Sequence, residues 1–192
     1  MQNLFSIVPD HGLAAFCGDN RLVLCLPLLG DEVTAEKAFA EKLQQLFDKA
    51  GYRVCIGIGE RQCSLEGYRD SYFQALQCIT LLQKLLKGRG ISHINDWGII
   101  RLMDSIPNKI RQNFAHHYDW FLMNLSTEQE ETLEAFLESD LNVKEAADRL
   151  HLHRNTLLYR LDKLTEQMKL DPKKFNDAII YKLLLICKRL GT

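Results

Sequence analysis

Residues 142–164, NVKEAADRLHLHRNTLLYRLDKL, constrain the fold of this chain more than any other segment. Apolar residues recur at helical spacing before and after the sequence HLH, and this pattern predicts two helices joined by a tight turn. Asn142 suits the N-cap of the first helix, because its side chain can accept from the free N–H groups of the first turn. Glu145, three residues later, resembles the second member of a capping box.

One face of each predicted helix is apolar, and two small residues lie where the helices would meet. The first helix has Val143, Ala146, Ala147 and Leu150 on one face. The buried stripe predicted for the second helix comprises Leu157, Leu161, Leu164 and Met168, with Leu158 beside it. We expect Leu152 to enter the core between the helices. His151 takes the turn position that Gly often holds, and His tolerates the left-handed region better than most residues.

Burial of the leucine stripe leaves a polar, cationic face on the second helix. Its members are Arg154, Asn155, Thr156, Tyr159, Arg160 and Lys163. Such side chains read base edges in the major groove, which admits a helix. We expect the first four to reach bases, whereas Arg160 and Lys163 contact phosphates. Periodicity alone leaves open an ordinary solvated surface helix, or a helical adaptor that serves only protein assembly.

Residues 133–172 resemble the C-terminal helix-turn-helix of the PucR/CdaR family of bacterial transcriptional regulators. The resemblance is carried by HRNT at 153–156 and YRL at 159–161, with a leading helix at 133–137 and the LDP sequence at 170–172. It implies a sequence-specific regulator that binds double-stranded DNA, and it adds His153 to the DNA-binding residues. We expect this regulator to act as a homodimer or larger assembly. It also implies a small-molecule effector, of unknown identity, sensed through a region outside this sequence.

Composition excludes several other classes. The chain has 192 residues, 46% of them hydrophobic, but it has no apolar run long enough for a membrane span and no signal-like start, so we expect a cytoplasmic protein. The net charge of −1 is not typical of nucleic-acid binding. Positive charge is local to the second helix, so tight binding requires a dimer that pairs two such helices.

The cysteines and histidines show no metal-ligand spacing, and we expect no metal and no cofactor. We predict that most cysteines are reduced thiols buried in apolar runs. The six are Cys17, Cys25, Cys55, Cys63, Cys78 and Cys187. His116 and His117 are adjacent and would point in different directions on a helix.

We predict an α+β fold with three segments. Residues 1–104 alternate strands and helices, residues 105–126 form a helical connector, and residues 127–192 form the all-α helix-turn-helix domain. The first segment is expected to hold a hairpin at 13–27, helices at 34–50 and 65–86, and strands at 52–59 and 91–94, with its helices on one sheet.

In the connector, a helix is expected to start at Pro107 and to run to about residue 124. Its candidates for burial are Ile110, Phe114, Phe121 and Leu122. Thr127 is expected to cap the next helix, and Asp171 and Pro172 to begin the last one, which would bury Phe175, Ala178, Ile179, Leu183 and Ile186.

Residues 17–27, 52–60 and 65–76 resemble the GGDEF-like domain of the same regulators. A full domain of that kind begins with a strand and helices that have no clear counterpart before the hairpin. The chain is therefore expected to be either a fragment of a longer regulator or a naturally short relative. The nucleotide-cyclase signature is replaced by residues 17–21, CGDNR, which lack the paired glycines and the following acidic residue. We therefore expect a degenerate domain and no enzyme activity. A catalytically inactive module for ligand binding or protein interaction is the alternative function. Gly57 and Gly59 more often indicate close packing of a helix on the strand than a phosphate-binding loop.

An enzyme site would need convergent polar groups. The nearest candidates are Glu60, His93 and Asp96.

Overall fold

The computed structural model describes residues 11–18, 20–27, 33–86 and 88–191. The chain divides into two compact units, Met1–Trp97 and Gly98–Thr192, which are described separately. Side chains at 33, 65 and 120–122 lie outside the described part, so the predicted burial of Phe121 and Leu122 does too. The predicted connector, 105–126, belongs to the second unit.

The first unit begins with the predicted hairpin. Strand β1 (Leu13–Phe16) pairs antiparallel with β2 (Leu22–Cys25). Gly18 has a φ of 71°, a left-handed conformation that glycine adopts at little cost, and Cys17 N–H donates to the Arg21 carbonyl at 2.9 Å. The hairpin is confirmed.

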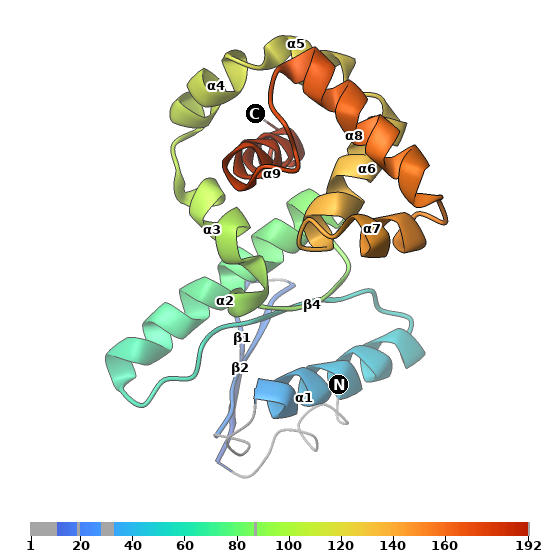
Figure 1. The fold of residues 1–192 in the computed structure, drawn as a ribbon. Helices are drawn as coiled ribbons and strands as arrows, with labels where there is room; N and C mark the ends of the chain where they lie inside the picture. The colour runs from blue at the N-terminus through green and yellow to red at the C-terminus, as the bar shows by residue number, and fades with distance from the viewer. Residues whose placement is uncertain (1–10, 19, 28–32, 87, 192) are drawn as a thin grey trace. The chain divides into compact units, whose positions relative to one another are not determined.

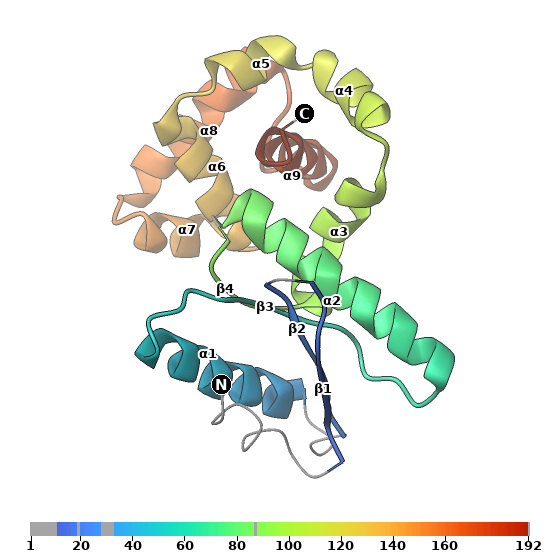
Figure 2. The same cartoon turned by 180° about the vertical axis from the view of Figure 1, so that it is seen from behind.

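A second pair of strands is parallel. Strand β3 (Cys55–Ile58) pairs with β4 (Gly90–His93), and α2 (Leu65–Leu85) makes the crossover that a parallel pair requires. Helices α1 (Val33–Lys49) and α2 lie on either side of this pair (Figures 1 and 2). The prediction of one continuous sheet is wrong for the described residues, which form two separate two-stranded sheets. Short turn η1 (Ile94–Trp97) ends the unit.

Close contact between β3 and α2 explains the two glycines of the sequence IGIGE. A Cβ atom added to Gly57 would lie 2.1 Å from the Ala75 carbonyl oxygen, and one added to Gly59 would lie 2.0 Å from that of Ser71. Both distances are far below van der Waals contact. The glycines therefore permit the helix backbone to lie against the strand, as their positions in a strand predict.

The second unit is helical. Figures 1 and 2 show its other helices arranged around α9. They are α3 (Gly98–Ser105), α4 (Asn108–His116), α5 (Asp119–Asn124), α6 (Thr127–Glu138), α7 (Val143–Arg149), α8 (Arg154–Met168) and α9 (Phe175–Arg189).

Two features of the predicted connector helix are corrected. The single helix from Pro107 is interrupted at residues 117–118, so that α4 and α5 are separate. Ile110 is exposed, because it lies on the face of α4 opposite Ala115, which is buried. Phe114 packs against the core as predicted.

The main core of this unit joins α6, α7, α8 and α9. Its fully buried members include Leu133, Phe136, Ala146, Ala147, Leu157, Leu161, Leu164, Tyr181 and Leu184. A second cluster joins α3 and α4 to the last turns of α9, through Met103, Ala115, Ile186 and Cys187.

Helix starts differ from two predictions. Ser126, and not Thr127, caps α6, in a reciprocal capping box with Gln129. Helix α9 begins at Phe175, because Asp171 forms a turn: its backbone and side-chain oxygens accept from the N–H groups of the residues that follow Pro172.

Burial also departs from prediction at several side chains. Phe175 and Ile179 are exposed, whereas Ala178 and Ile186 are buried and Leu183 is half-buried, because the core lies on the opposite side of the first turns of α9. Among the cysteines, Cys78 and Cys187 are buried as predicted, but Cys25 and Cys63 are exposed and the other two are half-buried.

Gly57→Ala is expected to destabilise the first unit by about 1–3 kcal/mol, because its methyl group would force α2 away from β3. Cys55→Ala, on the same strand and half-buried, is the control and should cost less. Urea denaturation measures both. A Gly57→Ala protein as stable as the control would contradict the close packing.

Tyr181→Phe is expected to cost about 1–2 kcal/mol at neutral pH, because the buried hydroxyl donates to the Leu170 carbonyl at 3.0 Å. Burial, followed by the nearby carboxylates of Asp177 and Asp171, raises the pKa of Tyr181 above its ordinary 10.0. The raised pKa means that this contribution is complete below about pH 10 and is lost as the pH rises further. The stability gap between wild type and variant, measured by denaturation from about pH 8 to about pH 11, should therefore shrink at the alkaline end. A constant gap would refute this role for the hydroxyl.

Candidate nucleic-acid interface

The first helix of the predicted motif is α7, and Asn142 caps it as predicted. Its side-chain oxygen accepts from Lys144 N at 3.0 Å and from Glu145 N at 3.3 Å. The capping box with Glu145 is not seen, because Asn142 N–H donates to the Ser139 carbonyl at 2.8 Å. Ala146 and Ala147 are buried against α8, where their small size permits close approach.

The turn between α7 and α8 is a Schellman motif. Leu152 N–H donates to the Ala147 carbonyl at 2.8 Å, and His151 N–H donates to the Asp148 carbonyl at 3.1 Å. His151 has a φ of 53°, so it adopts the left-handed conformation that glycine often supplies. Leu152 is half-buried rather than part of the core.

Helix α8 starts at a histidine cap. His153 Nδ1 accepts from Asn155 N at 3.2 Å, which satisfies one of the free donors of the first turn. Leu157, Leu161 and Leu164 are fully buried, and Met168 packs on the same core. The predicted stripe is confirmed.

The opposite face of α8 presents most of the predicted contact residues to solvent. Those exposed are His153, Arg154, Asn155, Thr156, Tyr159 and Lys163. Lys163 Nζ lies 4.7 Å from the centre of the Tyr159 ring, in a cation–π contact. The hydrogen bond to Tyr159 raises the pKa of Lys163, so the ammonium stays charged. Helix α8 is drawn in orange in Figure 1.

Arg160 departs from the prediction that it faces outward. Its guanidinium lies on α6, where Nη2 is 2.6 Å from Glu128 Oε1 and Nη1 donates to Thr132 Oγ1 at 3.4 Å. The side chain is half-buried. Neither partner could be predicted from local spacing, because both are more than 25 residues away along the chain. The contact between Tyr159 and Lys163, by contrast, can be predicted from their i, i+4 spacing on α8.

Carboxylates of α6 pair with cations from three other helices. The pairs are Glu128–Arg160, Glu130–Lys188, Glu134–Arg189 and Glu138–Arg149. Within the described ranges, Arg154 and Lys163 have no ion pair. The positive charge available to a ligand on α8 therefore lies on its exposed face.

The residues considered for an enzyme site in the first unit have structural roles. Asp96 Oδ2 accepts from His93 N at 2.8 Å, and its Oδ1 pairs with Lys37 at 2.7 Å. Partial burial acts to raise the pKa of Asp96, but the bonds from Lys37 and His93 outweigh it, so the pKa is lowered. Buried His93 has Nε2 3.7 Å from Glu36, and Glu60 bonds to Gln74.

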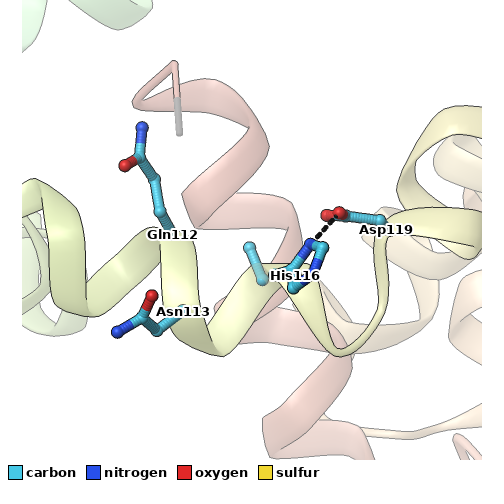
Figure 3. Close-up of a pocket in the computed structure, with 5 residues that line it drawn as sticks. Gln112, Asn113, His116 and Asp119 are labelled. Carbon is cyan, nitrogen blue, oxygen red and sulfur yellow. Dashed lines mark hydrogen bonds and ion pairs between the residues drawn. The ribbon is translucent and has the colours of Figure 1, made fainter.

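A shallow surface pocket lies on α4 and α5 in the second unit (Figure 3). It is lined by Gln112, Asn113, Ala115, His116 and Asp119, and His116 Nδ1 is bonded to Asp119 Oδ2. His116 is 84% exposed, and the pocket lining has no serine, threonine, cysteine or lysine. Across the described ranges, no cluster of His, Cys, Asp and Glu has metal-binding geometry, and no helix is long and apolar enough to span a bilayer.

Two family models match this chain. Residues 130–187 match the PucR C-terminal helix-turn-helix domain, and residues 1–81 match the GGDEF-like domain. The first match includes all of α7 and α8.

Similar proteins include three from Bacillus subtilis (strain 168). The DNA-binding transcriptional activator AdeR is 28% identical over 175 residues, which is 85% of this chain and 41% of that protein. The proline-responsive transcriptional activator PutR is 27% identical over 183 residues, 89% of this chain and 44% of that protein. The purine catabolism regulatory protein is 34% identical over 95 residues, 44% and 18% of the two chains. This chain thus spans less than half the length of each of these relatives.

His153→Ala is expected to destabilise the second unit by about 0.5–2 kcal/mol, because the first turn of α8 loses its cap. His153→Ser supplies a new acceptor and should restore most of the loss. Thermal denaturation of both variants checks this. Equal stability of the alanine variant and wild type would show that the cap contributes nothing.

Proposed function

We propose that this chain, which joins a GGDEF-like domain to a PucR-type helix-turn-helix domain, acts in sequence-specific DNA-binding transcriptional regulation. The similar proteins named as transcriptional activators or regulators support this function. The single observation that carries it is the exposure of Arg154, Asn155 and Thr156 together at the first turn of α8.

The geometry of α8 suits the major groove. Its 15 residues correspond to a rod about 22 Å long, and the groove is about 12 Å wide. The leucine stripe holds one side of this rod on the core, so the polar side is free to enter the groove. Recognition helices of this motif contact bases with their N-terminal residues, which are the exposed ones here.

Each exposed side chain then has a role that fits its chemistry. Arg154 would bond the acceptors of guanine, Asn155 would pair with adenine, and Thr156 would contact a thymine methyl group or a phosphate. Tyr159 would reach a base or sugar, and Lys163, held beside it, would contact phosphate. His153, whose Nδ1 is occupied by the cap, would offer Nε2 to the backbone.

Homodimerisation is part of the proposal. One helix with few available cations gives modest affinity, because non-specific binding depends on the number of neutralised phosphates. Two such helices would read two half-sites separated by about one helical turn of DNA. The protein would act in the cytoplasm, where bacterial DNA is accessible.

The GGDEF-like domain would be a non-catalytic module for assembly or ligand binding. The sequence CGDNR replaces the cyclase signature, although Asp19 lies outside the described residues. A small-molecule effector is also proposed. The names of the similar proteins refer to proline for one and purine catabolism for another, so they point to no common effector.

Selection of bound duplexes from a random DNA pool tests the activity and yields the preferred sequence. For the selected duplex, Arg154→Ala/Asn155→Ala is expected to weaken binding at least about 30-fold, since each bidentate base contact contributes about 1–3 kcal/mol. Fluorescence anisotropy measures the affinity, and circular dichroism checks the fold.

Glu41→Ala/Lys42→Ala, on the exposed side of α1, is the matched control and should bind like wild type. Wild-type affinity in the Arg154→Ala/Asn155→Ala protein would refute the proposed function. Affinity that does not fall as salt rises would instead favour a helical assembly module, because phosphate contacts release counterions.

A further inference from the structure

We propose that Arg160 is a positioning residue that fixes α8 against α6 through Glu128 and Thr132, rather than a ligand of DNA phosphate. The proposal rests on the proposed function, since what it positions is the DNA-reading face of α8. It assigns to α6 a part in specificity through its contact with α8.

Two groups of α6 contact the Arg160 guanidinium, one through an ion pair and one through a hydrogen bond. Glu128 Oε1 pairs with Nη2 at 2.6 Å, and Thr132 Oγ1 accepts from Nη1 at 3.4 Å. Thr132 is fully buried, and its hydroxyl donates to the Glu128 carbonyl at 2.7 Å. This donation fixes the hydroxyl hydrogen and directs a lone pair of Oγ1 to Arg160. The three groups therefore form one connected network.

The network constrains a motion that the leucine stripe leaves free. Apolar contacts of Leu157 and Leu161 are non-directional, so they determine which face of α8 is buried but tolerate small rotations. The hydrogen bond from Arg160 to Thr132 depends on angle, and the ion pair with Glu128 adds a second contact to α6 away from the axis of α8. Arg154 lies six residues away, about 9 Å along the helix, so a rotation of α8 would be transmitted directly to the first turn.

Charge argues against a phosphate contact by the same side chain. The Arg160 side chain is only 25% exposed, and its charge is already matched by Glu128. A phosphate would have to displace that carboxylate, so the exchange would add little counterion release. Lys163, one turn farther along the helix, is exposed beside Tyr159 and is the better phosphate ligand.

The experiment compares two duplexes of equal length, one recovered by selection from a random pool and one of random sequence. Affinities of the full chain for both are measured by anisotropy at several salt concentrations. Arg160→Ala and Glu128→Gln are each expected to lower the ratio of selected to random affinity by roughly fivefold, a coupling typical of residues in one network. The double variant should lower it no further, and the salt dependence should not change in Arg160→Ala.

Lys163→Ala is the matched comparison on the same helix. It should lower both affinities, leave their ratio unchanged and reduce the salt slope by about 0.9, as loss of one phosphate contact requires. Global destabilisation would also leave the ratio unchanged, so the ratio separates positioning from a merely structural role.

Three outcomes would overturn the inference. They are an Arg160→Ala protein that behaves like Lys163→Ala, a Glu128→Gln protein with an unchanged ratio, and losses that add in the double variant. If wild type itself shows no preference for the selected duplex, the proposed function fails and the inference fails with it. The two failures are therefore distinguishable from the wild-type data alone.

Discussion

Burial of the α8 leucine stripe against the small residues of α7 is the constraint on which the rest of the second unit depends. Leu157, Leu161 and Leu164 are fully buried, and Ala146 and Ala147 let the two helices approach closely. Because burial of one face of a helix leaves the opposite face exposed, this packing determines which residues of α8 face solvent. The reading face is thus a consequence of core formation, and a larger side chain at either alanine would move that face as well as weaken the core.

The charge of the chain is organised by the same packing. A net charge of −1 argues against a nucleic-acid ligand only if the charges are spread evenly. Instead, Glu128, Glu130, Glu134 and Glu138 of α6 each pair with a cation from another helix of the unit. The most exposed of these pairs, Glu138–Arg149, adds little stability. Because these pairs neutralise cations elsewhere in the unit, the exposed cations of α8 produce the local positive potential. A phosphate backbone would be attracted to that face.

Local patterns predicted this structure well, and tertiary contacts account for most of the differences. The hairpin, the capping of α7 by Asn142, the turn at His151 and the leucine stripe each follow from residues within a few positions of one another. Arg160 is half-buried and pairs with α6 instead of facing fully outward, because helical periodicity gives only the direction of the Cα–Cβ bond, whereas a long side chain can reach back to a neighbouring helix. The start of α9 was misplaced because Asp171 and Pro172 form a turn whose bonds involve Asp177, within α9. The DNA contacts themselves remain predictions.

The contact between β3 and α2 limits where the first unit could receive a small molecule. A single added carbon at Gly57 or Gly59 would already collide with the helix backbone. A phosphate group is several times larger, so the side of the strand that faces α2 is sterically closed to metabolites. Any effector that this unit binds must therefore contact a different surface. A mutational search for its binding site can omit the contact between β3 and α2.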